Sequence, residues 1–135
     1  MNGDTHIPPS RPWTIANACL LLAFVFSVIV QFNDPDPWPW ALIYASAALI
    51  CALEIRRRVR WPAPALLAGI AVLWAATIAP RVLGKVNFTD MFAEFEMANL
   101  GIEESREMYG LLIVAAWMTA VAVAAWRRSR LAQRL

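Results

Sequence analysis

The chain has 135 residues, of which 60% are hydrophobic and only 16% are charged. Soluble globular domains are about 45–50% apolar and about 25% charged, so this composition excludes an ordinary soluble domain and indicates a membrane protein. The net charge is only +2, and the length is that of a single domain.

Four apolar segments follow one another, and each has roughly the 20 residues that a helix needs to cross the hydrocarbon core of a membrane. Lipid offers no hydrogen-bond partner to a free backbone, so such segments cross as helices. A soluble bundle would need helices with a polar face, and none of the four has one. The sequence therefore predicts an all-α integral membrane protein. The predicted parts are a cytoplasmic tail at 1–12, a four-helix transmembrane domain at 13–127 with helices at 13–32, 37–55, 61–80 and 103–126, and a basic tail at 128–135.

The basic residues sort to one side of this arrangement. With the N-terminus inside, nine of the twelve fall on the inner side, at positions 11, 56–60 and 127–134. Basic residues mark the cytoplasmic side, so both termini are predicted to be cytoplasmic, in a plasma or inner membrane. These arginines are then membrane anchors, which excludes a nucleic-acid partner. Eight of the ten acids fall on the outer side, a grouping that the topology rule does not require.

The first predicted turn, QFNDPDPW, carries an unusual set of polar residues. The turn explains part of this set. Asn33 tolerates the left-handed conformation that ends a helix, and Asp36 is placed to cap the next helix with Pro37 in its first position. A turn does not explain Gln31 or Asp34. The stretch is therefore either a tight turn alone or one half of a binding site.

A second acidic cluster opens the last predicted helix. The helix dipole favours Glu103, Glu104 and Glu107 in its first turns. Arg106 either pairs with these acids or reaches the first turn. Both clusters fall on the outer side, so they are within reach of a shared site. Between the third and fourth spans, residues 88–100 have apolar residues at helical spacing, which predicts an amphipathic helix on the outer interface.

Small residues recur along two spans, which permits close helix contact or a homo-oligomer. These are Ala41, Ala45, Ala48 and Ala52, and Ala116, Ala120 and Ala124. Cys19 and Cys51 are expected to be small buried residues without a disulfide. Trp13 is expected to anchor an inner helix end at the interface.

Two blocks of the sequence resemble the transmembrane protein 220 family, whose members are small multi-span proteins. VQFNDPDPWPWALIY matches the family's Q-x-N-D-P-D turn followed by Trp and Tyr. EESREMYGLLIVAAW matches its E-E-x-R-E-x-x-G-L start to a later helix. The matching positions are Gln31, Asn33, Asp34, Pro35, Asp36, Trp40 and Tyr44 in the first block, and Glu103, Glu104, Arg106, Glu107, Gly110, Leu111 and Trp117 in the second. The resemblance implies the fold and singles out these residues, but it implies no reaction.

The candidate residues for a binding site or a structural clasp come from both blocks. They are Gln31, Asn33, Asp34, Asp36, Tyr44, Glu103, Glu104, Arg106 and Glu107. The favoured function is a structural or accessory membrane protein, in which Arg106 clasps Asp34 or Asp36 and a membrane protein is the partner.

The alternative function is a binding site on the outer face, for a divalent cation or a lipid headgroup. Carboxylate oxygens without histidine or thiolate suit calcium or magnesium. The metal ligands would be Asp34, Asp36, Glu103, Glu104 and Glu107. A membrane enzyme is least favoured, because no nucleophile is identifiable and no acid or base lies near the middle of a span.

Overall fold

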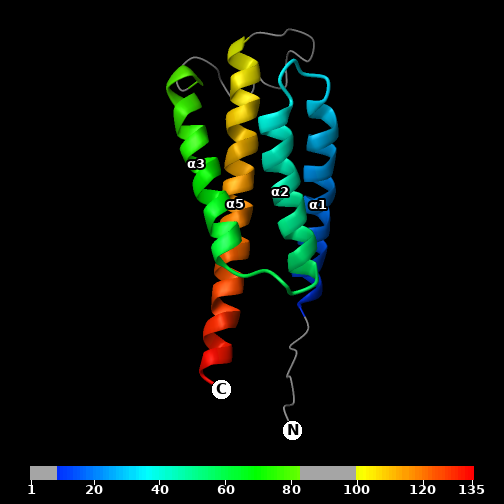
Figure 1. The fold of residues 1–135 in the computed structure, drawn as a ribbon, viewed down its shortest axis with the longest axis vertical. Helices are drawn as coiled ribbons and strands as arrows, with labels where there is room; N and C mark the ends of the chain where they lie inside the picture. The colour runs from blue at the N-terminus through cyan, green and yellow to red at the C-terminus, as the bar shows by residue number, and fades with distance from the viewer. Residues whose placement is uncertain (1–8, 83–99) are drawn as a thin grey trace. The chain divides into compact units, whose positions relative to one another are not determined.

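The structure, a computed structural model, describes residues 9–82 and 100–135. These residues form four helices, α1 (Arg11–Gln31), α2 (Trp38–Ile55), α3 (Pro62–Val82) and α5 (Leu100–Gln133) (Figure 1). All four are long and apolar enough to cross a membrane, and the described ranges contain no strand. The protein is therefore an all-α integral membrane protein, as predicted. The amphipathic helix predicted at 88–100 lies outside the described residues except for its last position, where α5 begins.

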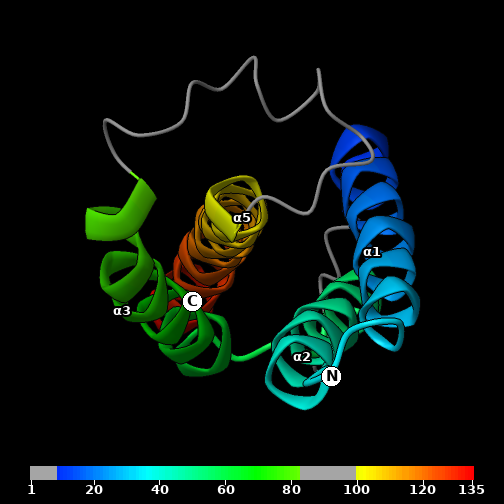
Figure 2. The same cartoon turned by 90° about the horizontal axis from the view of Figure 1, so that it is seen from above.

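The chain divides into two compact units, Met1–Val59 and Arg60–Leu135. Each unit is built on one pair of packed helices, α1 with α2 and α3 with α5. Figures 1 and 2 show the members of each pair side by side along their length.

In the first unit, α1 packs on α2 through few side chains. Only Asn17 and Phe24 are buried on α1, and they are separated by seven residues, or about two helical turns. The ring of Phe24 stacks on that of Tyr44 in α2, with centroids 6.4 Å apart. Most other large apolar side chains of α1, such as Leu22 and Phe26, are exposed on the isolated chain. In a bilayer, an exposed apolar face of this kind contacts lipid.

In the second unit, the buried side chains of both helices recur at alternating intervals of three and four residues. On α5 they include Met108, Leu111, Ala115, Met118, Ala122 and Ala125, and on α3 they include Pro64, Ala68, Ala71, Ala75, Ile78 and Val82. This is the heptad spacing of helices that pack side by side with a small crossing angle. Alanines form much of the buried face of α3 and part of that of α5, and small residues of this kind permit two helix backbones to pack closely.

The predicted packing stripes are only partly correct. Ala41 and Ala48 of α2 are buried, whereas Ala45 is exposed. On α5, Ala116 is exposed and Ala120 and Ala124 are only half-buried, so this stripe lies outside the buried face of the helix, and its contact with a second copy stays a prediction. Residues spaced by four drift around a helix by about 40° at each step, whereas heptad spacing stays on one face. Of the cysteines, Cys51 is buried as expected but Cys19 is exposed, and both are free.

The C-terminal end of α2 has a defined hydrogen-bonded geometry. The N–H of Arg57 donates to the carbonyl of Glu54, and the N–H of Arg58 donates to the carbonyl of Leu53, both at 2.9 Å. These two bonds form a Schellman motif, which satisfies carbonyls that the end of a helix leaves free. The motif needs a left-handed residue, and Arg57 adopts a φ of 58° in the position that glycine usually fills. The Nε atom of Arg57 is also buried without a hydrogen-bond partner.

Candidate functional site

The α1–α2 turn is held by backbone hydrogen bonds. The N–H groups of Phe32, Asn33 and Asp34 donate to carbonyls three residues earlier, at 3.3, 3.3 and 2.9 Å. Bonds of this type tighten the last turn of a helix. The backbone of Asn33 therefore does not adopt the predicted left-handed conformation, and Arg57 is the only residue other than glycine with a positive φ in the described part of the chain. The rings of Phe32 and Trp38 then meet edge to face across the turn, with centroids 6.0 Å apart.

The predicted helix cap at Asp36 is wrong. The N-cap of α2 is Pro37, Trp38 is the first helical residue, and no side chain accepts a capping hydrogen bond there. The carbonyl of Pro37 instead accepts the first backbone bond, from the N–H of Ala41. The side chains of Asp34 and Asp36 are both exposed. The structural explanation for Asp36 is thereby lost, and two carboxylates stand at a turn that does not use them as caps.

The structure gathers four of the first-block candidates at this turn and places the fifth elsewhere. Asn33, Asp34 and Asp36 are exposed and Gln31 is half-buried. Tyr44 is only 7% exposed and stacks on Phe24. It lies six residues into α2, or roughly 9 Å along the helix from Trp38. Tyr44 is therefore a core residue of the α1–α2 pair.

The second candidate block lies on α5. Arg106 is exposed and Glu107 is half-buried, between the buried residues Ser105 and Met108. The backbone of Glu103 and Glu104 is helical, and their side chains lie outside the described part of the structure. Because α5 already begins at Leu100, these acids lie from the fourth helical position onward. The helix dipole acts mainly within the first turn, so it explains less of this cluster than the sequence predicted.

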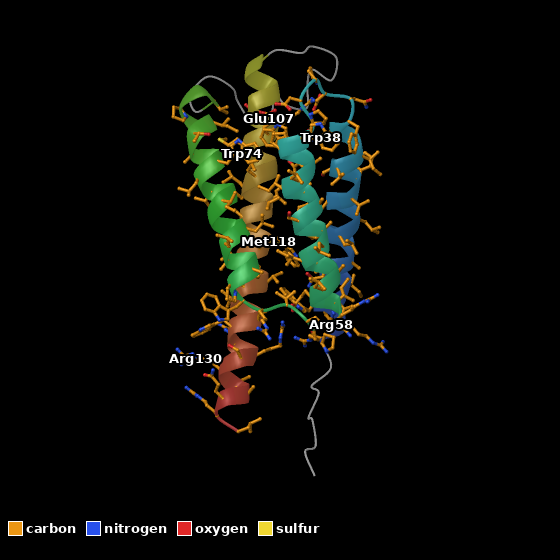
Figure 3. All side chains as sticks on the ribbon, viewed as in Figure 1. Trp38, Arg58, Trp74, Glu107, Met118 and Arg130 are labelled. Atoms are coloured by element: carbon orange, nitrogen blue, oxygen red, sulfur yellow. The ribbon has the colours of Figure 1, made fainter. Side chains whose placement is uncertain are left out.

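The clasp between Arg106 and the first turn would join residues of different units, and it stays a prediction. Among the residues described, no group of three or more His, Cys, Asp or Glu side chains is placed to hold a metal ion. Figure 3 shows Trp38 and Arg58 at opposite ends of α2, and Glu107 and Arg130 at opposite ends of α5. Within each unit, the acidic candidates therefore lie at the helix ends remote from the arginine runs.

A polar cluster that was not predicted from the sequence lies at the other end of the first unit. Glu54, in the last turn of α2, is 0% exposed. Its Oε1 atom accepts a hydrogen bond from Nε1 of Trp13 at 2.9 Å. The amide nitrogen of Asn17, which is also 0% exposed, donates to the carbonyl of Trp13 at 3.0 Å. The bond between the indole and the carboxylate thus joins the start of α1 to the end of α2, and the Asn17 amide bonds within α1, one turn after Trp13.

One signal for this cluster was present in the sequence. Glu54 is the only acid within the run from Cys51 to Arg60 that contains four arginines. From the sequence, Glu54 was one of the two acids on the inner side, and no role was predicted for it. Trp13 was expected to anchor the helix end at the interface, and the structure adds a hydrogen bond from its indole to a buried carboxylate. A buried charge needs such a partner, because desolvation without one is costly.

Comparison with known proteins decides the family. A family profile described as "Transmembrane family 220, helix" matches residues 23–123. The chain belongs to the transmembrane 220 family. This match spans the α1–α2 turn, Glu54 and the whole second candidate block, whereas Trp13, Asn17 and the last arginines lie outside it.

A relative in this family is the Transmembrane protein 220 of Xenopus laevis. It is 29% identical over 119 residues, which cover 84% of this chain and 60% of the relative. The chain thus spans less than two thirds of the length of that relative. No solved structure matches the chain.

Proposed function

We propose that this member of the transmembrane 220 family is a structural or accessory membrane protein that presents its acidic α1–α2 turn to a partner protein. One observation carries the proposal. Asp34 and Asp36 are both exposed at a turn that is fixed by backbone bonds, and neither caps a helix. Carboxylates that have no role in holding the turn are free to serve recognition.

The geometry of the turn favours a binding role over a loose connection. The edge-to-face rings of Phe32 and Trp38 and the fixed φ angles of Pro35 and Pro37 restrict its conformations. A restricted turn loses little conformational entropy when it docks. A hydrogen bond to a charged group contributes about 1.5–3 kcal/mol, so two carboxylates can supply a substantial part of the affinity for a basic partner.

A second candidate function uses the same exposed carboxylates to bind calcium or magnesium, the hard cations that prefer oxygen ligands. Two carboxylates leave such an ion incompletely coordinated, so the turn would have to share it with Glu103, Glu104 or Glu107 or with a partner. The two functions differ in their geometric demands. A docked basic side chain tolerates a longer acid, whereas a chelated cation needs its oxygens at about 2.0–2.6 Å.

Co-purification from native membranes tests the proposal. The tagged full chain is compared with three variants: D34N/D36N, which removes the charges; D34E/D36E, which keeps them on longer side chains; and N33A, an uncharged change in the same turn. We expect a partner with the wild type, with D34E/D36E and with N33A, and none with D34N/D36N. If D34N/D36N retains the same partner, the acidic turn does not recruit it. A second tagged copy in the same membranes identifies self-association.

Thermal unfolding of the purified chain tests the cation alternative. Millimolar calcium or magnesium should raise the unfolding temperature of the wild type and not that of D34N/D36N, because a ligand that binds only the folded state stabilises it. D34E/D36E should lose this response if the ion is chelated. An unchanged unfolding temperature in the wild type excludes the cation function.

The orientation in the membrane is part of the same proposal. The arginine runs that follow α2 and end α5 support cytoplasmic termini and an acidic turn on the opposite side. Accessibility of single cysteines introduced at positions 36 and 133 to a membrane-impermeant thiol reagent tests this, in a background without Cys19 and Cys51. Labelling of position 133 from outside intact cells would show that the orientation is the opposite of the one proposed.

A further inference from the structure

The C-terminal end of α5 carries a basic hollow that the proposed function does not use. The hollow has a volume of about 490 Å³ and is lined by Trp126, Arg127, Arg130, Leu131 and Arg134. All five residues lie on one helix. The three arginines are spaced by three and four residues, so they share one face of α5. Their side chains are all exposed.

The length of α5 places this hollow at the level of the lipid headgroups. The helix has 34 residues, which at 1.5 Å per residue is about 51 Å, well beyond the roughly 30 Å of a hydrocarbon core. The apolar part of α5 ends at Trp126, and the next residues are arginines. Tryptophan and arginine at such a boundary are typical of the membrane interface. The hollow therefore faces the phosphates of one leaflet.

One arginine is already oriented. The guanidinium carbon of Arg130 lies 5.2 Å from the ring centroid of Trp126, in cation–π contact. Stacking on an aromatic face restricts the guanidinium while leaving its N–H edge available, and that edge matches a phosphate in bidentate fashion. Arg127 and Arg134 flank it along the helix, one nearly a turn before and one just over a turn after.

The lining combines positive charge with apolar surface. Trp126 is 42% exposed and Leu131 is 59% exposed, beside the three arginines. A free phosphate would use only the arginines, whereas a phospholipid also covers apolar side chains with its glycerol and upper acyl chains. Runs of arginine beside a transmembrane helix attract anionic lipids. The combination of charge and apolar surface favours the lipid.

We propose that this hollow binds the phosphate of an anionic phospholipid in the leaflet that faces the C-terminus. Arg127, Arg130 and Arg134 hold the phosphate, and Trp126 and Leu131 contact the apolar part of the same lipid. The site shares no residue with the acidic turn, and it lies at the other end of α5 from the second candidate block.

Native mass spectrometry of the full chain in a non-ionic detergent, titrated with phosphatidylglycerol, measures this binding. We expect the wild type to retain phosphatidylglycerol in preference to phosphatidylcholine. The triple variant R127Q/R130Q/R134Q should bind it at least about tenfold more weakly, since each basic residue contributes to the attraction. The matched control is R56Q/R58Q/R60Q. It removes three exposed arginines from the predicted same side of the membrane and leaves the hollow intact, so its affinity should equal that of the wild type.

Two results would overturn the proposal. Equal losses in the two triple variants would mean that bulk charge attracts the lipid. Displacement of the lipid by millimolar inorganic phosphate would mean that the hollow binds soluble anions. If the first triple variant fails to fold, as judged by circular dichroism, R130K provides the test. It keeps the charge but loses the planar fork, and it should weaken binding while R58K does not.

Discussion

The hydrogen bond between Trp13 and Glu54 should measurably stabilise the first helix pair. The substitution Trp13→Phe removes the indole donor and leaves the buried carboxylate with one partner fewer. A hydrogen bond to a charged group contributes about 1.5–3 kcal/mol. Trp61→Phe is a suitable control, because Trp61 also lies next to a helix start and is 44% exposed, and its one described hydrogen bond uses its backbone carbonyl, which the substitution keeps. It should cost less than about 0.5 kcal/mol.

A double-mutant cycle isolates the bond from any other contact of Glu54. Glu54→Met replaces the carboxylate by an apolar side chain of similar length and leaves the indole N–H unpaired. The free energy of unfolding is measured for the wild type, W13F, E54M and the double variant, in mixed micelles with increasing dodecyl sulfate, by circular dichroism. The double variant should lose about 2 kcal/mol less than the sum of the single losses, since replacing both partners removes the unpaired group.

Additivity would refute this reasoning. If the two single losses sum to the double loss within about 0.5 kcal/mol, the bond contributes nothing to stability. A loss for W61F equal to that for W13F would show that only the size of the ring matters. Either result would leave the burial of Glu54 without its described explanation.

Three further predictions use the same unfolding assay. Arg57→Gly should raise the free energy of unfolding by about 1 kcal/mol, because glycine adopts the left-handed φ of 58° without steric cost, and a loss would contradict the Schellman assignment. Leu111 is 0% exposed, so Leu111→Ala should lower the free energy of unfolding by about 2–4 kcal/mol, whereas Leu112 is 42% exposed and Leu112→Ala should lower it little. Equal losses would mean that the packing face of α5 lies elsewhere. Arg106→Asp should cost up to about 1 kcal/mol, and adding Asp34→Arg should restore it if the predicted clasp forms.

The four spans were predictable because lipid imposes a length and a hydrophobicity that are visible in composition alone. The end of the last helix was not. The prediction stopped it at residue 126, where the arginines begin, but α5 continues to Gln133. The arginines mark the end of the apolar core, and arginine is a good helix former, so the helix continues in the interface. The arginines therefore show where the apolar core of the membrane ends, but they do not show where the helix ends.

The packing faces could not be predicted for a related reason. In a soluble helix the polar face shows which side is buried. These spans are apolar all round, so their sequence does not show which side of each helix packs against its neighbour. The stripe from Ala116 to Ala124 was therefore chosen by residue size alone, and the structure buries Ala115, Ala122 and Ala125 instead.

The candidate site was predictable in part. The turn that gathers Asn33, Asp34 and Asp36 followed from its prolines and its place between two spans. The N-cap of α2 was not predictable, because a helix start at Trp38 in place of Pro37 removes Asp36 from the N-cap position. The burial of Glu54 was hidden by its arginine neighbours, which made it look like a solvated charge.

The end of α2 bears on how the protein enters its membrane. The Schellman motif at Arg57 satisfies the last carbonyls of the helix within six residues of the next span. With Trp13 joined to Glu54, the first hairpin has its own hydrogen bonds at the end where the chain leaves it. We therefore expect residues 1–59 to insert as a unit before the second hairpin is complete. The second hairpin can follow as a separate event, as domains of a growing chain fold one after another.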